Sequence, residues 1–182
     1  KAARLQAAVE EVLAGPDRFD TLYVVGDALS EAPPAQGTPE QIYVGYSSDG
    51  RVVGFAIDAA QPGFADVVRL IFGYDPASHQ LLGIKVLENK ETPGLGDYID
   101  PKKDRNKAAP WIRQFDATGF ERVAAADWKV NKDGGKFDAR AGATISARAV
   151  TNATRQALQF AVDHRDKLYA LPAQSRLEKE AP

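Results

Sequence analysis

The sequence predicts an α+β fold in which a mainly antiparallel sheet is packed with an N-terminal helix and a long C-terminal helix. Helical periodicity of apolar residues is concentrated at the two ends of the chain, and short β-prone segments separated by turn signals lie between them. Strands that follow one another in such short succession favour antiparallel pairing. With 182 residues and no repeat or internal boundary, the chain is expected to form one domain over residues 1–182.

The N-terminal helix is predicted over residues 1–15. Its apolar side chains recur at the i, i+3, i+4, i+7 and i+8 positions of one helical face, and Gly15-Pro16 ends the pattern. The β-prone segments that follow are residues 21–25, 42–46, 52–57, 67–74 and 81–88. Turn residues at 47–51 and 75–79 predict two hairpins, because Asp-Gly supplies a positive φ and Asp-Pro favours a turn.

The second half of the chain is less regular until its last helix. Four elements are predicted in chain order: an irregular loop at 91–97, a short helix at 110–115, β structure at 128–130 and a turn at 131–135. A long helix is predicted from about Ile145 to about Tyr169, and residues 172–182 are expected to be a flexible tail. The buried stripe of that helix is predicted to consist of Ile145, Ala149, Val150, Ala153, Ala157, Phe160, Ala161 and Leu168.

Composition excludes several classes of function. The formal net charge is -2 and the basic residues are scattered, which argues against a nucleic-acid-binding protein. The absence of cysteine removes disulfides, thiolate nucleophiles, iron–sulfur clusters and covalent haem. His79 and His164 are not spaced as a ligand pair, so no metal site is expected.

No apolar run reaches the roughly 18 residues of a membrane span. The chain begins with Lys1 and contains no methionine, so we expect a further segment to precede it in the natural protein. A tag, a signal peptide and a membrane anchor all fit this expectation.

The segment that carries chemistry is 138–146. Gly142 and Ala143 are small residues that allow the backbone close to a ligand, and Thr144 follows them where the last helix begins. A helix N-terminus favours a phosphate, and a hydroxyl there can be esterified to it. The alternative is that Thr144 only caps the helix, although the acidic partner of a capping box is replaced by Ala147.

A second candidate segment lies about fifty residues upstream. It consists of Glu91, Thr92, Pro93, Gly94, Leu95 and Gly96, followed by Asp97. Its glycines would let backbone amides approach a ring edge, and Leu95 can cover a ring face. The alternative is an ordinary Pro-Gly turn.

Together these segments resemble the FMN-binding domains found in the G subunit of the Rnf complex and in the C subunit of the sodium-pumping NADH:quinone reductase. The resemblance extends from about Tyr43 to Leu168, and Asp97 favours the Rnf branch. It implies FMN covalently attached through its phosphate to Thr144, recognition of Asp138 by a flavin transferase, and contacts from the 91–96 loop. Ile145 and Ser146 complete the implied cofactor site. Two positions depart from the family pattern. Ala141 replaces the usual Ser, and Phe64 lies in a turn that is richer in glycine in relatives.

Other candidate residues have simpler explanations. Asp97, Asp100 and Asp104 alternate with basic residues, which predicts a mixed surface loop rather than a cation site. Trp111 and Trp128 are more typical of a core than of a flavin stack. For Lys136 and Arg140, exposed charge is the first expectation, with neutralisation of the flavin phosphate as the alternative.

The resemblance implies an electron-transfer component of an ion-translocating ferredoxin:NAD oxidoreductase complex, not a stand-alone enzyme. The domain would be anchored to the bacterial inner membrane through an N-terminal helix absent from this chain, and would face the periplasm or cell exterior. Its partners would be the other subunits of the complex. Two rivals remain: a soluble extracytoplasmic FMN-carrying shuttle, and a ligand-binding or structural module without flavin.

Overall fold

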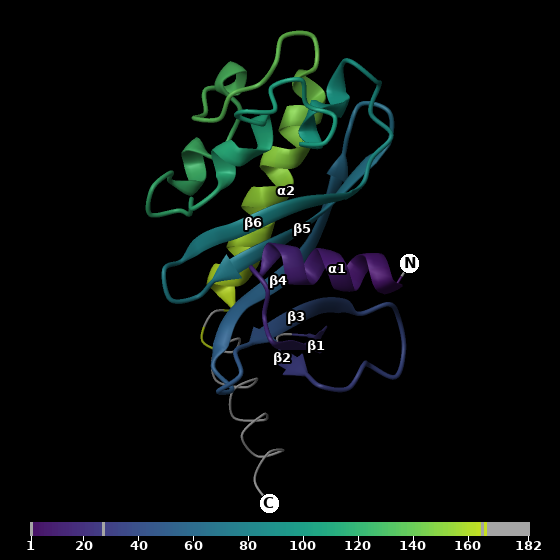
Figure 1. Ribbon diagram of the computed structural model, residues 1–182, viewed down its shortest axis with the longest axis vertical. Helices are drawn as coiled ribbons and strands as arrows, with labels where there is room; N and C mark the ends of the chain where they lie inside the picture. The colour runs from purple at the N-terminus through teal and green to yellow at the C-terminus, as the bar shows by residue number, and fades with distance from the viewer. Residues whose placement is uncertain (1, 27, 165, 167–182) are drawn as a thin grey trace, which may run out of the picture.

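The computed structural model describes residues 2–26, 28–164 and 166. A six-stranded antiparallel sheet with the strand order β2-β1-β3-β4-β5-β6 has one helix on each face (Figure 1). The fold class predicted from the sequence is confirmed. The elements are α1 (Ala2–Val12), β1 (Arg18–Val25), β2 (Ala28–Ser30), β3 (Glu40–Tyr46), β4 (Val52–Pro62), β5 (Val67–Asp75), β6 (Gln80–Glu88) and α2 (Thr144–Asp163).

Helix α1 packs against a part of the sheet that is rich in glycine. Strands alternate their side chains between two faces, and on the α1 face Gly45, Gly54, Gly73 and Gly83 occupy four neighbouring strands. A Cβ built on Gly73 would stand 2.0 Å from the carbonyl oxygen of Val12, which shows how closely the end of α1 approaches β5. The sheet therefore has room for the helix backbone itself at this point.

This close approach makes Gly73 a sensitive position. We expect Gly73→Ala to lower the free energy of unfolding by about 3 kcal/mol, because the new methyl group would displace the backbone of Val12 at the end of α1. Gly83→Ala is the matched control: Gly83 pairs directly with Gly73, and its Cβ would be at an ordinary 3.5 Å from Val12. Urea unfolding of both variants tests the contrast, and equal stabilities would contradict it.

The larger core lies on the other face, between the sheet and α2. Phe55, Leu70 and Phe72 point from β4 and β5 toward the buried alanine-rich side of α2. Small residues such as Ala149 and Ala153 let the helix lie close to the strands, where each buried apolar group stabilises the fold. The predicted stripe on α2 is confirmed in its central part, whereas Leu168 lies outside the described residues.

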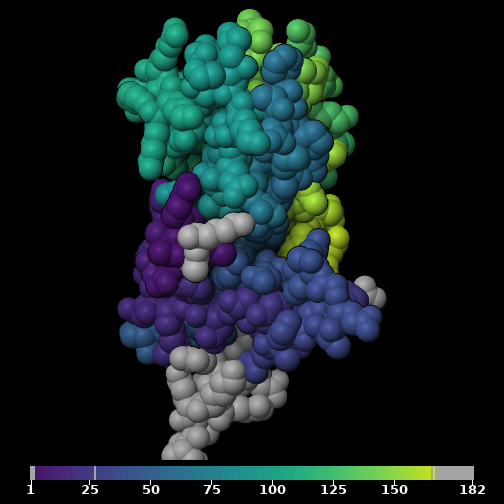
Figure 2. All heavy atoms as spheres, turned by 90° about the vertical axis from the view of Figure 1, so that its right-hand side faces the viewer, coloured from purple at the N-terminus to yellow at the C-terminus, as the bar shows by residue number. Residues whose placement is uncertain are grey.

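The segment between β6 and α2 forms the end of the molecule opposite to β1 and β2 (Figures 1 and 2). Its short 3₁₀ turns are η1 (Gly96–Ile99), η2 (Trp111–Phe115), η3 (Ala125–Asp127) and η4 (Asn131–Asp133). Phe115 stacks on Phe137 with ring centroids 4.5 Å apart, and Trp128 packs on Phe137 at 4.6 Å. This aromatic cluster gives an irregular segment a fixed position above the start of α2.

Several predictions of local structure need correction. Strand β2 was not predicted, because three residues at a sheet edge make too short a pattern to recognise. The β structure predicted at 128–130 is only an isolated bridge between Val130 and Phe137. The described part of the C-terminal helix ends at Asp163, and both Tyr169 and the predicted tail at 172–182 lie outside the described residues.

Candidate functional site

The two chain segments whose sequences predict a cofactor site meet at the start of α2, and a third segment joins them. They are the 91–96 loop after β6, the 142–146 segment, and the turn between β4 and β5. Together they enclose a cavity of about 120 Å³. Its lining consists of Phe64, Glu91, Thr92, Leu95, Gly96, Gly142, Ala143, Thr144, Ile145 and Ser146. The structure thus brings two motifs about fifty residues apart in sequence to one place, although neither Pro93 nor Gly94 lines the cavity.

Thr144 is the first residue of α2 and does not cap it. The N-cap position belongs to Ala143, which makes no capping hydrogen bond through its side chain. Gly142 precedes it with a φ of +79°, a conformation that favours glycine. Within residues 2–26, 28–164 and 166 no hydrogen bond engages the Thr144 hydroxyl. The interpretation of Thr144 as a simple helix cap is therefore wrong.

Glu91 connects the three segments through hydrogen bonds to its carboxylate. Its carboxylate is 4% exposed and accepts hydrogen bonds from the backbone N–H of Phe64 at 3.1 Å and of Ala65 at 3.2 Å. The Ser146 hydroxyl donates a third, short hydrogen bond to it. Because this carboxylate is buried beside the first turn of α2, the helix end also stabilises its charge. Glu91 thereby fixes the walls of the cavity rather than projecting into solvent.

Two glycines leave space for the Glu91 carboxylate and the Ser146 hydroxyl. A Cβ on Gly63 would stand 2.5 Å from Glu91 Oε1, and a Cβ on Gly96 would stand 2.2 Å from Ser146 Oγ. Both distances are too short for any side chain. Gly96 is therefore required for close packing under the cavity, which is a different role from the approach to a ring that the sequence suggested.

The mouth of the cavity has an apolar rim. Phe64 is 69% exposed, Leu95 56% and Ile145 43%, so three of the large apolar side chains that face solvent gather around Thr144. The prediction that Ile145 belongs to the buried stripe of α2 is wrong for this reason. Phe64 was noted in the sequence only as a departure from the family pattern, and its exposure on the β4–β5 turn reveals its position at the rim. Exposed apolar groups around a small cavity are typical of a surface that a ligand covers.

The segment leading to Thr144 is held at both ends. The Trp111 indole N–H donates to the carbonyl of Asp138 at 2.7 Å, and the Tyr98 hydroxyl donates to the carbonyl of Ala143 at 3.0 Å. The Asp138 side chain itself is exposed and accepts a hydrogen bond from the Asn131 amide at 2.6 Å. Asp138 thus lies outside the cavity, on a surface that another protein can reach.

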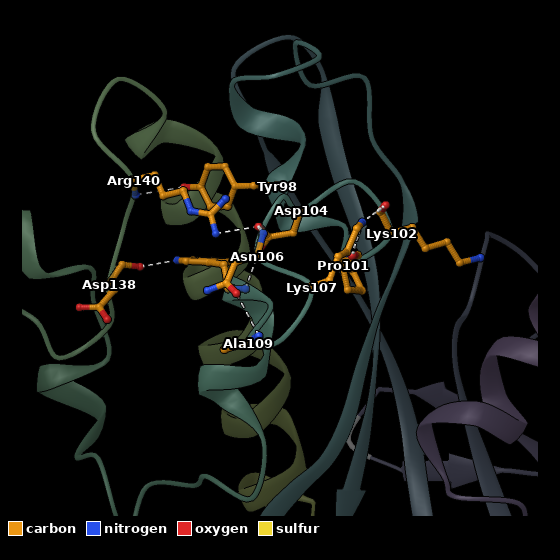
Figure 3. A network of polar contacts seen from close by, with 10 residues as sticks. Tyr98, Pro101, Lys102, Asp104, Asn106, Lys107, Ala109, Asp138 and Arg140 are labelled. Atoms are coloured by element: carbon orange, nitrogen blue, oxygen red, sulfur yellow. Dashed lines mark hydrogen bonds and ion pairs between the residues drawn. The ribbon is translucent and has the colours of Figure 1, made fainter.

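Arg140 and Asp104 form an ion pair beside this segment (Figure 3). The guanidinium lies 2.7 Å from the Asp104 carboxylate and over the Tyr98 ring, 4.6 Å from its centroid. Asp104 is fully buried, so the expectation that it belongs to a mixed surface loop is wrong. Arg140, expected to be an exposed charge, is held in place by this pair. No local sequence signal indicated the pairing, because the two residues are far apart along the chain.

The pair has consequences for pH. Burial on its own raises the pKa of Asp104, but hydrogen bonds from the backbone N–H of Trp111 and Asn106 and from Arg140 outweigh it, and the pKa lies below its ordinary value. A carboxyl whose pKa is lowered by folding contributes stability above its unfolded pKa of about 3.9, and this contribution is lost as the pH falls through the lower folded value.

We therefore expect Asp104→Asn to lower the free energy of unfolding by about 2 kcal/mol at pH 7, since the Arg140 charge loses its buried partner. The deficit should narrow as the pH falls below about 4, where the Asp104 carboxyl of the unfolded chain becomes protonated, and it should vanish as the pH falls through the lower pKa of the folded carboxyl. Chemical unfolding at several pH values measures it. Asp133→Asn is the control, because its partner Arg148 forms a more exposed pair. A deficit that is independent of pH would exclude the ionised pair as its cause.

Larger hollows lie elsewhere. One of about 640 Å³ is lined mainly by charged side chains between α1 and β6, and another of about 550 Å³ lies where β3 begins. Neither contains a residue of the two motifs. The described part of the chain contains no cluster of three or more His, Cys, Asp or Glu that could hold a metal ion. Among those same residues, no helix is long and apolar enough to cross a membrane.

Comparison with known proteins identifies relatives of this site. The family model described as FMN-binding domain matches residues 63–159, which include the cavity from Phe64 to Ser146. The crystal structure of NqrC from Shewanella oneidensis has a TM-score of 0.65 at 15% identity, and the match covers 96% of this chain and 98% of that chain. At this identity the likeness supports the fold alone.

Sequence relatives are closer. The G subunit of the ion-translocating oxidoreductase complex of Pseudomonas aeruginosa (strain UCBPP-PA14) is 36% identical over 171 residues, covering 92% of this chain and 76% of that protein. The corresponding G subunits of Haemophilus influenzae (strain ATCC 51907 / DSM 11121 / KW20 / Rd) and Aliivibrio fischeri (strain ATCC 700601 / ES114) are 37% and 39% identical over 127 residues. Those matches cover 69% of this chain and 58% of each relative. The chain belongs to the FMN-binding domain family, in the branch that contains the G subunits of the ion-translocating oxidoreductase complexes.

Proposed function

We propose that this domain carries FMN in a phosphoester bond to Thr144 and relays electrons within an Rnf-type ion-translocating ferredoxin:NAD oxidoreductase complex. The observation that carries the proposal is the position of the Thr144 hydroxyl. It lines a small cavity at the first turn of α2, it does not cap the helix, and the apolar side chains of Phe64, Leu95 and Ile145 surround it.

Three hydroxyl groups line the cavity, and their surroundings distinguish them. The Ser146 hydroxyl is committed to Glu91 by a hydrogen bond. Thr92 lies on the upstream loop and belongs to no helix. Among these three, Thr144 alone joins an uncommitted hydroxyl to the first turn of α2, where backbone N–H groups without intrahelical partners favour a phosphate. This argues for Thr144 as the point of attachment.

The cavity also fits a ring that remains partly exposed. Its volume of about 120 Å³ is well below the roughly 300 Å³ at which pockets begin to enclose a drug-sized ligand. Phe64, Leu95 and Ile145 would contact the ring from the rim, and the rest of the ring would face solvent or a partner. An exposed edge suits electron transfer between proteins, because the donor and acceptor must come close to it.

When bound, FMN supplies the one- and two-electron chemistry, and the polypeptide positions it. The residues of this chain hold the attachment point rather than take part in bond rearrangement. Glu91 fixes the cavity walls, Tyr98 and Trp111 hold the segment before Thr144, and the apolar rim excludes water from one side of the site. This division of work fits an electron-transfer component of a larger complex.

The names of the relatives supply the rest of the proposal. The Pseudomonas aeruginosa relative is named as part of an ion-translocating oxidoreductase complex, and the partners of this chain would be the other subunits of such a complex. We infer a bacterial inner-membrane location with the domain facing the periplasm or cell exterior, and an N-terminal anchor outside this chain. A flavin transferase would attach FMN, and the exposed carboxylate of Asp138 is available for recognition by it.

Production of the protein with and without a flavin transferase tests the attachment. With the transferase we expect the intact mass to rise by one FMN phosphoester, the protein to become yellow, and the modified peptide to contain Thr144. A colourless protein of unmodified mass after exposure to transferase and FAD would refute the proposal. Linkage to a membrane complex is tested separately with the full-length gene product, since a cleaved signal peptide would favour a soluble shuttle.

A further inference from the structure

A second cavity adjoins the attachment segment. It has a volume of about 210 Å³ and shares Leu95 and Ala143 with the cavity that contains Thr144. Among the described residues, the cationic side chains of Lys103, Arg105 and Arg140 line it, and Asp97 supplies the only carboxylate of the lining. We call it the cationic pocket. In a chain with a net charge of -2, this local excess of positive charge requires an explanation.

The cationic pocket has a fixed shape. Asp104 accepts hydrogen bonds from the backbone N–H of Asn106 at 3.0 Å and of Trp111 at 2.7 Å, and it pairs with Arg140 (Figure 3). The Lys107 ammonium donates to the carbonyls of Pro101 and Lys102 and so closes the loop on itself. These bonds organise the loop from 100 to 111 that presents Lys103 and Arg105. The two cations are therefore displayed by an ordered loop and not by a loose charged run.

Lys103 and Arg105 have no carboxylate partner within the part of the chain that the structure describes. Asp97 directs its carboxylate to the backbone N–H of Gly94 at 3.0 Å. The Arg105 guanidinium reaches over Gly94, 3.5 Å from the position that a Cβ would take there. Two cations without a carboxylate partner among the described residues thus line one pocket beside the segment that bears Thr144, although Lys103 also borders the hollow of about 640 Å³. An anion from outside the chain is suited to compensate their charge.

We propose that the cationic pocket is a binding site for a phosphate group. Guanidinium and ammonium groups are the usual side-chain donors to phosphate, and Arg105 and Lys103 together offer several N–H bonds to one oxyanion. This proposal rests on the attachment of a flavin phosphate at Thr144. The ligand phosphate is either that of the attached FMN itself or a second phosphate on the molecule that delivers the flavin.

The test is a titration of the unloaded, ¹⁵N-labelled protein with inorganic pyrophosphate at constant ionic strength, followed by the amide shifts of Arg105, Ala141 and Ala143. We expect saturable shifts at these amides. The double variant Lys103→Gln, Arg105→Gln should raise the dissociation constant at least tenfold. Both side chains are exposed, so the variant should fold, and an unchanged melting temperature would verify this.

The matched control is Lys132→Gln, Arg155→Gln, which removes the same charge from η4 and from the exposed side of α2. Arg155 is eleven residues from Thr144, about 16 Å along the helix. We expect the dissociation constant for pyrophosphate to change less than twofold in this control. Absence of saturable shifts, or equal weakening in both double variants, would overturn the proposal.

The flavin-loaded protein distinguishes the two sources of the phosphate. If loading blocks pyrophosphate binding, the phosphate of the attached FMN occupies the cationic pocket. If loaded and unloaded proteins bind pyrophosphate alike, the pocket receives a second phosphate. The phosphate site and the attachment of FMN can be refuted independently. A protein that takes up FMN at Thr144 but does not bind pyrophosphate in its unloaded form refutes the phosphate site alone.

Discussion

Replacing Thr144 by Val is expected to abolish the covalent FMN adduct completely. The change exchanges the hydroxyl for a methyl group of similar size and leaves no oxygen to form the phosphoester. Because Thr144 is not the N-cap, the free energy of unfolding should change by no more than about 0.5 kcal/mol. Intact-mass measurement after production with a flavin transferase gives the first result, and urea unfolding of the unloaded protein gives the second.

Thr92→Val is the control for this experiment, because Thr92 contributes the other threonine hydroxyl of the cavity. It should retain the adduct. An adduct that persists in Thr144→Val, or is lost in Thr92→Val alone, would move the attachment point. A loss of stability of about 1 kcal/mol or more in unloaded Thr144→Val would contradict the expectation that the Thr144 hydroxyl contributes little to the stability of α2.

Replacing Glu91 is expected to have a large effect on both the stability of the fold and the shape of the site. Glu91→Ala leaves the N–H groups of Phe64 and Ala65 and the Ser146 hydroxyl without their common acceptor, so we expect a loss of about 3 kcal/mol in the free energy of unfolding. The same change should loosen the turn, loop and helix that form the cavity. The measurement is urea unfolding of the unloaded protein.

Glu91→Gln separates the charge from the shape. It keeps the side-chain volume but removes a buried negative charge beside the proposed flavin site, so reduction of the flavin should become easier and its midpoint potential should rise. The control is Glu88→Gln, an exposed residue three positions earlier, for which the potential should stay constant. Spectroelectrochemical titration of the flavin-loaded proteins measures these midpoint potentials. An unchanged potential in Glu91→Gln would limit Glu91 to a purely structural role.

The fold and most residues of the candidate site could be predicted from the sequence, because the patterns that indicate them extend over only a few neighbouring residues. Helical periodicity selected α1 and α2, and the Asp-Gly and Asp-Pro turns located the hairpins of β3–β4 and β5–β6. The two motifs selected nine of the ten residues that line the cavity; Phe64 is the one they missed. The same patterns failed at β2, which has only three residues, and at 128–130, where a bridge replaces a strand.

What the chain determined by itself was the order of elements and the chemical identity of the candidate site: a threonine after small residues at a helix start, and a loop rich in glycine. The tertiary structure decided which groups surround that threonine. It buried Asp104 against Arg140, committed Ser146 to Glu91, and turned Phe64 and Ile145 outward. The physical reason is that burial and charge pairing depend on contacts between residues tens of positions apart, and no local pattern encodes them.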